Sequence, residues 1–201
     1  MALIHRATLR PSKLELLAAW LPDRPWATGT GELRPAGAYR FDDPAGEVGL
    51  EAHLLEAGGG MVLHVPLTYR DAPLPGAEHA LVGTAEHSVL GTRWVYDGCA
   101  DPVWVATVLA GAAQAEELVD ADGDLVPREP TARVTNAGGP PLPDDAPLTS
   151  HDDGPATVVR AGGVELVVVR VVGAEPAGDP VLTGTWATGG PATLATVRPA
   201  A

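Results

Sequence analysis

Hydrophobic and polar positions along this chain first follow the period of a helix and then that of strands. Apolar residues recur at helical spacing from 14 to 21, and Ser12 with Glu15 three residues later forms the pattern of a capping box. Pro22 cannot continue a helix, so we expect a short helix that ends before it. A short strand is expected ahead of this helix, at residues 2–8.

From residue 32 onward the pattern is typical of strands. Four are expected in this part of the chain, at 32–42, 46–55, 61–70 and 80–88. Three glycines at 58–60 suit a tight connection between the second strand and the third. The apolar side slips by one residue within these two strands, which suggests bulges or a strongly curved sheet. Pro66 cannot donate to a sheet, so the third strand should be bulged or at an edge there.

The stretch 81–103 combines two apolar runs, a break at Gly91 and the start of a second helix. Asp101 followed by Pro102 is a typical helix start, with aspartate as N-cap and proline at the first helical position. Apolar residues continue this helix to residue 117 or 118. A helix this apolar must pack against another element, most simply the sheet.

The composition changes after residue 119. Residues 120–155 contain seven Asp, seven Pro and four Gly among 36 residues, which leaves few apolar groups to offset the entropy of ordering. We expect a long acidic loop with one strand at 132–135. Strand patterns then return near the C-terminal end, at 156–160, 164–172, 181–187 and 193–198.

Together these patterns predict an α+β fold: a curved, bulged antiparallel sheet packed on two helices, with additional C-terminal β-strands. We expect a single domain over residues 1–201, because this length suits one hydrophobic core. Within it we expect a core at 1–119, the acidic Pro/Gly-rich loop at 120–155, and C-terminal strands at 156–201 that extend the sheet.

Composition and charge exclude several classes of function. The net charge is −13 and no cluster of Lys and Arg occurs, so we expect no nucleic-acid partner. No apolar run approaches the roughly 20 residues of a membrane-spanning helix, so no membrane is expected either. The start of the chain lacks the apolar segment of a signal peptide, and Cys99 is the only cysteine, which together suggest a cytoplasmic protein. Lys13 is the only lysine, a bias typical of a GC-rich bacterial genome.

The acidic loop offers the one sequence pattern that resembles a metal site. Asp120, Asp122 and Asp124 alternate as in a calcium loop, but Gly123 and Glu129 stand at the fourth and tenth positions instead of the sixth and twelfth. We interpret this run as a solvated acidic loop. The six histidines are scattered without the spacing of a zinc site, so neither a metal nor another cofactor is expected.

A catalytic interpretation is possible at Glu86, His87 and Ser88. Adjacent residues on a strand point to opposite faces, however, so His87 cannot act as a base on Ser88 within that strand. Cys99 precedes a helix start, but no base accompanies it, and we expect a small buried residue there. No catalytic residue is predicted; an enzyme that uses Glu86 or Asp97 remains an alternative.

Aromatic side chains indicate where a ligand could bind. The chain has five Trp and one Phe, and aromatic rings often stack on sugars. Trp20, Trp104 and Trp186 fall within expected elements and should pack in the core, whereas Trp26 and Trp94 lie near turns. The expected ligand or partner surface consists of Tyr69, Arg70, Glu86, His87, Arg93, Trp94, Tyr96 and Asp97.

Three separated segments carry a family resemblance: YRFDDPAGEVGLE at 39–51, VPLTYR at 65–70 and EHSVLGTRWVYDGCADPV at 86–103. Together they resemble the N-terminal cap domain of bacterial maltokinases, over about residues 2–119. They are also similar to short stand-alone proteins built on that cap, sometimes labelled as 1,4-alpha-glucan branching proteins. The resemblance implies a cystatin-like arrangement, in which a curved antiparallel sheet embraces a helix.

The resemblance also implies limits on activity. Maltokinases make maltose 1-phosphate from maltose and ATP with two kinase lobes that follow the cap. The present 201 residues show no catalytic-loop Asp with its Asn and no ATP-binding lysine strand, so we expect no kinase activity from them. Branching chemistry is not expected either, because it needs a larger barrel with two catalytic carboxylates.

Three hypotheses about function follow. The first is a non-catalytic cap-like protein that serves as an accessory or regulatory partner of enzymes of cytoplasmic glucan, maltose and trehalose metabolism. The second is a protein that binds a sugar or sugar phosphate on the concave face of the sheet. The third is the enzyme that uses Glu86 or Asp97.

Overall fold

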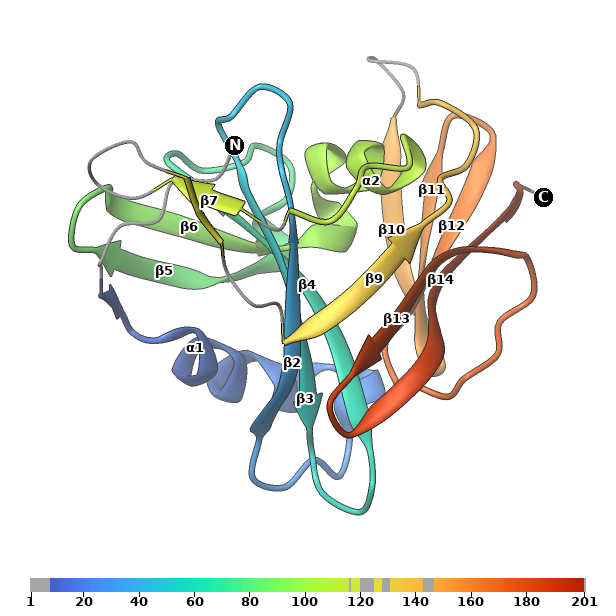
Figure 1. Ribbon diagram of the computed structural model, residues 1–201, viewed down its shortest axis with the longest axis horizontal. Coiled ribbons are helices and arrows are strands. Elements are labelled where there is room, and N and C mark those ends of the chain that lie inside the picture. Colours follow the sequence, from blue (N-terminus) through green and yellow to red (C-terminus); the bar gives the residue numbers. More distant parts are fainter. Residues whose placement is uncertain (1–7, 116, 120–124, 128–130, 143–146, 201) are drawn as a thin grey trace.

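The computed structural model describes residues 8–115, 117–119, 125–127, 131–142 and 147–200. Two antiparallel six-stranded sheets dominate these residues, with α1 and α2 packed against them (Figure 1). The α+β class and the further C-terminal strands are as the sequence predicts. The described residues contain no helix that is both long enough and apolar enough to span a membrane.

The first sheet has the strand order β1-β5-β6-β4-β3-β2. Its helix α1 (Lys13–Trp20) begins with the predicted capping box, in which the Ser12 side chain accepts from the Glu15 amide and the Glu15 side chain accepts from the Ser12 amide. The strand expected at 2–8 lies almost wholly outside the described residues. The strands of this sheet are β1 (Leu9–Arg10), β2 (Arg34–Phe41), β3 (Gly49–Glu56), β4 (Val62–Arg70), β5 (Leu81–His87) and β6 (Gly91–Asp97).

Bulges occur in this sheet, but not where the sequence pattern places them. The register between β3 and β4 is regular from Gly49↔Tyr69 to Glu56↔Val62, whereas shifts occur between Pro35 and Gly37 in β2 and between Leu81 and Gly83 in β5. The apolar side of β3 and β4 slips because both faces of these strands are covered. Leu63, Val65 and Leu67 pack toward α1, and Leu50, Ala52 and Leu54 pack toward the second sheet.

The sequence pattern suggests that the strands after residue 131 extend the first sheet, but this is wrong. They form a second sheet with the order β10-β11-β12-β14-β13-β9. Two of its strands lie inside the segment expected to be a loop. The expected strand at 132–135 is present as β9, but β10 is not predicted because it is a polar edge strand without an apolar period. The strands are β9 (Ala132–Asn136), β10 (Leu148–Asp153), β11 (Ala156–Ala161), β12 (Val164–Val169), β13 (Asp179–Trp186) and β14 (Gly189–Pro199).

Helix α2 (Pro102–Leu109) starts where predicted, with Asp101 as N-cap, but ends about two turns early. Gly111 adopts a φ of +70° directly after the helix, and the chain then leads to the two-stranded β7 (Glu117–Val119) and β8 (Leu125–Pro127). The expected extension to residue 117 or 118 is therefore wrong. A glycine in this left-handed conformation ends a helix at little steric cost, and it outweighs the apolar residues that follow.

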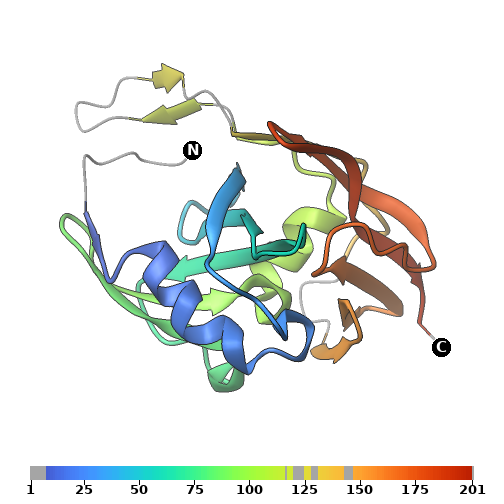
Figure 2. The same cartoon turned by 90° about the horizontal axis from the view of Figure 1, so that it is seen from below.

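A shared core joins the two sheets. Trp104 and Leu109 of α2 lie in one buried cluster with Leu50 and Leu54 of the first sheet and Leu182 of the second. A separate cluster lies on the other face of the first sheet, where α1 packs. Figures 1 and 2 show the second sheet (orange to red) and α1 (blue) on opposite sides of the long central strands. The first sheet is thus enclosed between two layers.

The two sheets also meet along the backbone. Directly after β12, residues 170–172 run beside the first half of β4, where the His64 amide donates to the Arg170 carbonyl and the Val172 amide donates to the Val62 carbonyl. Strand β6 takes over as the neighbour of β4 only from Leu67 onward. Pro66 lies between these two neighbours, where its missing N–H costs no hydrogen bond. The position is thus locally an edge, one of the two possibilities that the sequence leaves open.

Candidate functional site

The eight residues expected to form one surface are divided among separate places. Tyr69 and Arg70 are adjacent on β4 and point to opposite faces of the sheet. Trp94 pairs directly with Arg70, and Tyr96 lies on the same face two residues farther along β6. The other four are at the tip of the β5–β6 hairpin or at the end of β6. These eight described residues therefore do not form one shared concave surface.

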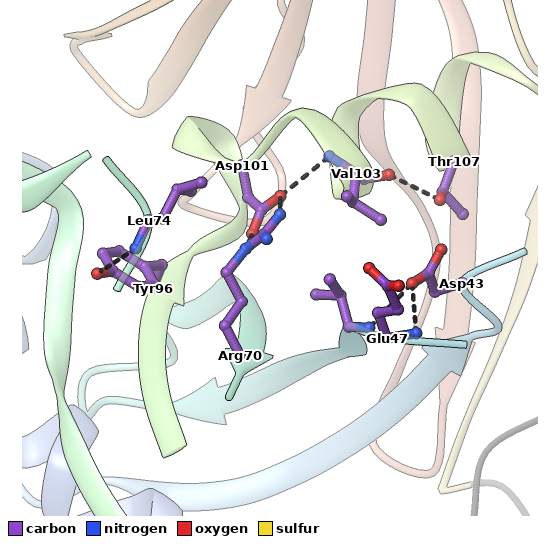
Figure 3. Close-up of polar contacts among 9 residues, drawn as sticks. Asp43, Glu47, Arg70, Leu74, Tyr96, Asp101, Val103 and Thr107 are labelled. Atoms are coloured by element: carbon purple, nitrogen blue, oxygen red, sulfur yellow. Dashed lines mark hydrogen bonds and ion pairs between the residues drawn. The ribbon is translucent and has the colours of Figure 1, made fainter. Parts of the chain in front are cut away.

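Arg70 and Asp101 form a clamp at the start of α2 (Figure 3). The Arg70 Nε and Nη2 groups donate to the two carboxylate oxygens of Asp101 at 2.7 and 2.8 Å. Asp101 is fully buried and also accepts from the Val103 amide at 2.9 Å, as the N-cap of the helix. The hydrogen bonds from Arg70 to Asp101 raise the pKa of the guanidinium above its usual range. Both charges of the clamp are therefore used to fix the helix to the sheet.

Other polar groups beside this clamp are used in the same way. The buried Asp43 carboxylate accepts from three backbone amides of its own turn, those of Ala45, Glu47 and Val48, at 2.9–3.0 Å. The Tyr96 hydroxyl accepts from the Leu74 amide at 2.9 Å, which holds the loop after β4 (Figure 3). This corner of the molecule is a structural junction, in which carboxylates and hydroxyls are bonded to backbone or to one another.

Glu86, His87 and Arg93 shape the tip of the hairpin. The Nδ1 atom of His87 accepts from the amides of Val89 and Leu90 at 3.3 and 3.0 Å, so this nitrogen carries no proton. Arg93 donates to the Leu90 carbonyl at 2.6 Å, and the Thr92 hydroxyl donates to Glu86 at 2.7 Å. These bonds hold the turn in one conformation.

Ser88 acts on a different part of the chain from its neighbour His87. Its hydroxyl accepts from the Thr8 amide at 3.0 Å and so fastens the hairpin to the segment that leads into β1. His87 instead accepts from amides of its own turn. The strand expected at 80–88 ends one residue earlier, at His87, so Ser88 lies in the turn and strand alternation does not apply to this pair.

The same hairpin carries the exposed large apolar side chains of the described residues. Val89 is 57% exposed, Leu90 is 44% exposed, and Leu81 at the start of β5 is 37% exposed. Val89 and Leu90 lie within the turn that His87 and Arg93 fix. We call these two residues the hairpin tip. It presents two aliphatic side chains to solvent on a backbone that is already ordered.

Asp97 takes part in a buried ion pair. Its carboxylate accepts from Arg170, which directly follows β12, and from the Cys99 amide. Burial favours the neutral form of Arg170, but the Asp97 charge outweighs it and raises the pKa of the guanidinium above its usual range. Arg170 also donates to Thr157 at 2.7 Å and lies over the Trp26 ring, 4.8 Å from its centroid. Trp26 is therefore a core residue and not part of a ligand surface.

Burial also favours the protonated thiol form of Cys99. The surrounding protein raises the pKa of the thiol well above its usual range, which disfavours a reactive thiolate. The candidate calcium loop at 120–129 falls largely outside the described residues and is not placed. Among the residues that are described, no three His, Cys, Asp or Glu side chains gather in a way that could hold a metal ion.

A polar cluster on the α1 side of the first sheet is not predicted from the sequence. Glu51 is buried on β3 and is paired with Lys13 from the first turn of α1, while His53 Nε2 lies 3.8 Å from the same carboxylate oxygen. Burial opposes ionisation of Glu51, but Lys13, His53 and Arg40 outweigh it and hold the pKa of the carboxyl at about 2. The one feature of the sequence that could have indicated this cluster is Glu51 itself, a glutamate within a mostly apolar strand.

Comparison with known proteins agrees with the motifs. Residues 20–101 match the family described as the maltokinase N-terminal cap domain. A search of curated proteins gives no match to this chain. The matched segment runs from the end of α1 through all of β2–β6 to the N-cap of α2, and it contains the Arg70–Asp101 clamp and the hairpin tip. This part of the chain is therefore a maltokinase N-terminal cap-like unit, as its sequence motifs predict.

Proposed function

We propose that this protein is a non-catalytic, cap-like accessory partner of an enzyme of cytoplasmic maltose, glucan or trehalose metabolism, and that it docks on that enzyme through the hairpin tip. The observation that carries the proposal is the pair of exposed side chains, Val89 and Leu90, on a turn held by His87 and Arg93. A rigid apolar projection loses little entropy on binding and can fill a pocket on a partner.

The distribution of polar residues supports a role without catalysis. Asp97 is committed to Arg170 and to the turn before α2, and Glu86 is bonded to Thr92 at the surface. Both carboxylates are thus engaged by groups that order the chain around them. The polar side chains that first suggest chemistry serve to hold the hairpin and the helix in place.

The partner chosen for the test is a maltokinase, because the matched family is a domain of that enzyme. Purified protein would be titrated against a maltokinase that lacks its own cap domain, with binding measured by biolayer interferometry. We expect saturable binding, and we expect the double variant Val89→Asp with Leu90→Asp to weaken it by about tenfold or more. Circular dichroism should show an unchanged fold, because both side chains are exposed.

The double variant Thr149→Asp with His151→Asp provides the matched control, because it adds two negative charges at exposed positions on β10, away from the hairpin. It should leave binding unchanged. Absence of binding, or binding that the hairpin variant leaves intact, would overturn the proposal.

A further inference from the structure

Trp94 differs from the other tryptophans of the chain in its surroundings. The other four belong to one of the two core clusters or, in the case of Trp186, pack against one, whereas Trp94 packs against neither of these described clusters. The indole N–H groups of Trp26 and Trp186 are buried. That of Trp94 is not buried and has no hydrogen bond within the described part of the chain, so solvent reaches it. Trp94 is therefore a surface tryptophan with a half-buried ring.

The pairing of β5 and β6 places exposed residues around Trp94. Thr84 lies directly opposite Trp94 in the register of these strands, and Glu86 lies opposite Thr92. Residues that are directly opposite, or two apart on one strand, point to the same face of a sheet. Leu81 shares this face because a register shift near the start of β5 turns it to this side. The three residues on β5 are exposed. We call these five residues the Trp94 strip.

The Trp94 strip is continuous with the hairpin tip, because both belong to the β5–β6 hairpin. The exposed large apolar side chains of the described residues, Leu81, Val89 and Leu90, all lie on this hairpin, and Trp94 is placed between its two ends. Figure 1 shows the hairpin on the side of the molecule away from the second sheet. A stable interface buries about 800 Å² on each partner, far more than two aliphatic side chains supply. The strip offers the additional area.

The charges beside the strip are balanced. Arg10 of β1 lies directly opposite Glu86 in the sheet register. Arg70 of β4 lies opposite Trp94, and its guanidinium is bonded to the Asp101 carboxylate. The net charge of −13 therefore resides mostly elsewhere, and charges more than about 8 Å away are largely screened at physiological ionic strength. A partner surface that fits the strip is apolar and carries no strong charge.

We propose that the Trp94 strip is the central part of the surface that docks on the partner enzyme, with the indole of Trp94 seated in an apolar, uncharged groove of that enzyme. Tryptophan is enriched among the residues that dominate binding energy, and such residues lie near the centre of an interface. The free indole N–H can donate to an acceptor in the groove. The inference rests on the docking role proposed above and adds the centre of the contact and the chemistry of the partner surface.

The test uses the same maltokinase without its cap domain, with binding measured by biolayer interferometry. Trp94→Ala and Thr84→Glu should each weaken binding by about tenfold or more, because the first removes the ring and the second buries a charge in the contact. Thr84 is exposed, so Thr84→Glu should keep the fold even if loss of the ring in Trp94→Ala disturbs it. Thr149→Glu adds the same charge on β10 and should leave binding unchanged.

Two further measurements report on the wild-type protein. The indole N–H signal of Trp94 in the ¹⁵N-labelled protein should shift on addition of the enzyme, whereas that of the buried Trp104 should stay in place. Affinity should change by less than about threefold between roughly 0.05 and 0.5 M NaCl, because no strong charges meet in the contact.

The outcomes separate this inference from the docking role itself. Binding that the hairpin-tip variant weakens, but that Thr84→Glu and Trp94→Ala leave intact, would keep the docking role and overturn the strip. Absence of binding by the wild type would overturn both. A loss of affinity of about tenfold over the same range of salt would overturn the uncharged groove. Sedimentation of the protein alone tests the other occupant, because a dimer that Thr84→Glu dissociates would assign the strip to a second copy of the chain.

Discussion

Arg170 and Asp97 form a buried ion pair that joins the two sheets. Arg170 follows β12 of the second sheet and is fully buried, and Asp97 ends β6 of the first. The Trp26 ring covers the guanidinium, so three layers of the molecule meet at one side chain. The buried guanidinium of Arg170 therefore connects the C-terminal sheet to the cap-like part, because its ion-pair partner Asp97 and the ring that covers it both belong to that part.

Replacement of Arg170 by Met should destabilise the protein strongly. The change leaves the Asp97 carboxylate without its buried partner, and loss of one member of such a pair costs about 3–5 kcal/mol. Urea unfolding, followed by tryptophan fluorescence, would measure the loss. Arg198→Met is the control, since it breaks an ion pair with Glu165 that lies nearer the surface, and it should cost much less. Equal losses in the two variants would contradict the importance of the junction.

The two roles of Asp101 can be separated by substitution. Asp101→Asn keeps a side chain that can cap α2 but removes the charge that pairs with Arg70, whereas Asp101→Ala removes both. We expect both variants to be less stable than the wild type, with the alanine variant lower by about a further 1 kcal/mol. Urea midpoints of the three proteins would show this order. Indistinguishable variants would mean that the cap contributes nothing.

Stability should fall as the pH drops below about 6.5, the usual pKa of histidine. His64 is buried between Tyr39 and the Val169 carbonyl, and burial lowers its pKa to about 3. Between these values the unfolded chain binds a proton that the folded chain does not. The free energy of unfolding therefore decreases by about 1.4 kcal/mol per pH unit at most.

Glu51 should add to this loss only below about pH 4.5, the usual pKa of a glutamate carboxyl, because the folded carboxyl stays ionised down to a pKa of about 2. Urea unfolding at pH 7, 6 and 5 therefore separates the histidine from this carboxylate. A His64→Gln variant should show a flatter dependence on pH across this range. A wild-type stability that is constant from pH 7 to pH 5 would contradict the burial of a neutral imidazole.

The end of α2 depends on contact between two glycines. Gly138 has a φ of +70°, and an added Cβ there would lie 2.8 Å from the Gly111 nitrogen. Gly138→Ala should therefore cost several times more than Gly46→Ala. Gly46 has a similar φ of +73° but nothing within 4 Å, so only the cost of the backbone conformation, about 1–2 kcal/mol, applies. Thermal unfolding of the two variants would check the order.

Local chemistry explains what could be predicted from the sequence. The capping box at Ser12 and the start of α2 at Asp101 depend on residues within four positions of each other, and both are present as expected. His87 and Ser88 make separate contacts as expected, but the reason differs from the one that the sequence suggests, because β5 ends at His87 and Ser88 lies in the turn. The family motifs lie largely within one continuous matched segment, which is why the cap-like part can be identified from short stretches of sequence.

The features that the sequence does not predict depend on long-range pairing. In the sequence, Arg170 is only a polar residue within an apolar run. Its partner Asp97 is 73 positions away, so no neighbouring residue indicates the ion pair. Lys13 and Glu51 are likewise 38 positions apart. The second sheet could not be told from an extension of the first, because strand patterns give the existence of strands but not their partners.

Lys13 gives the protein a chemical property of practical use. As the only lysine, it supplies the only side-chain amine that an acylating reagent can modify, beside the α-amino group. An ammonium held against a carboxylate reacts slowly, so the rate of acylation at this residue reports how often the contact with Glu51 opens. Mass spectrometry of the modified chain would measure this rate at the Lys13 amine. It would thus show how often the first turn of α1 separates from Glu51, without any introduced label.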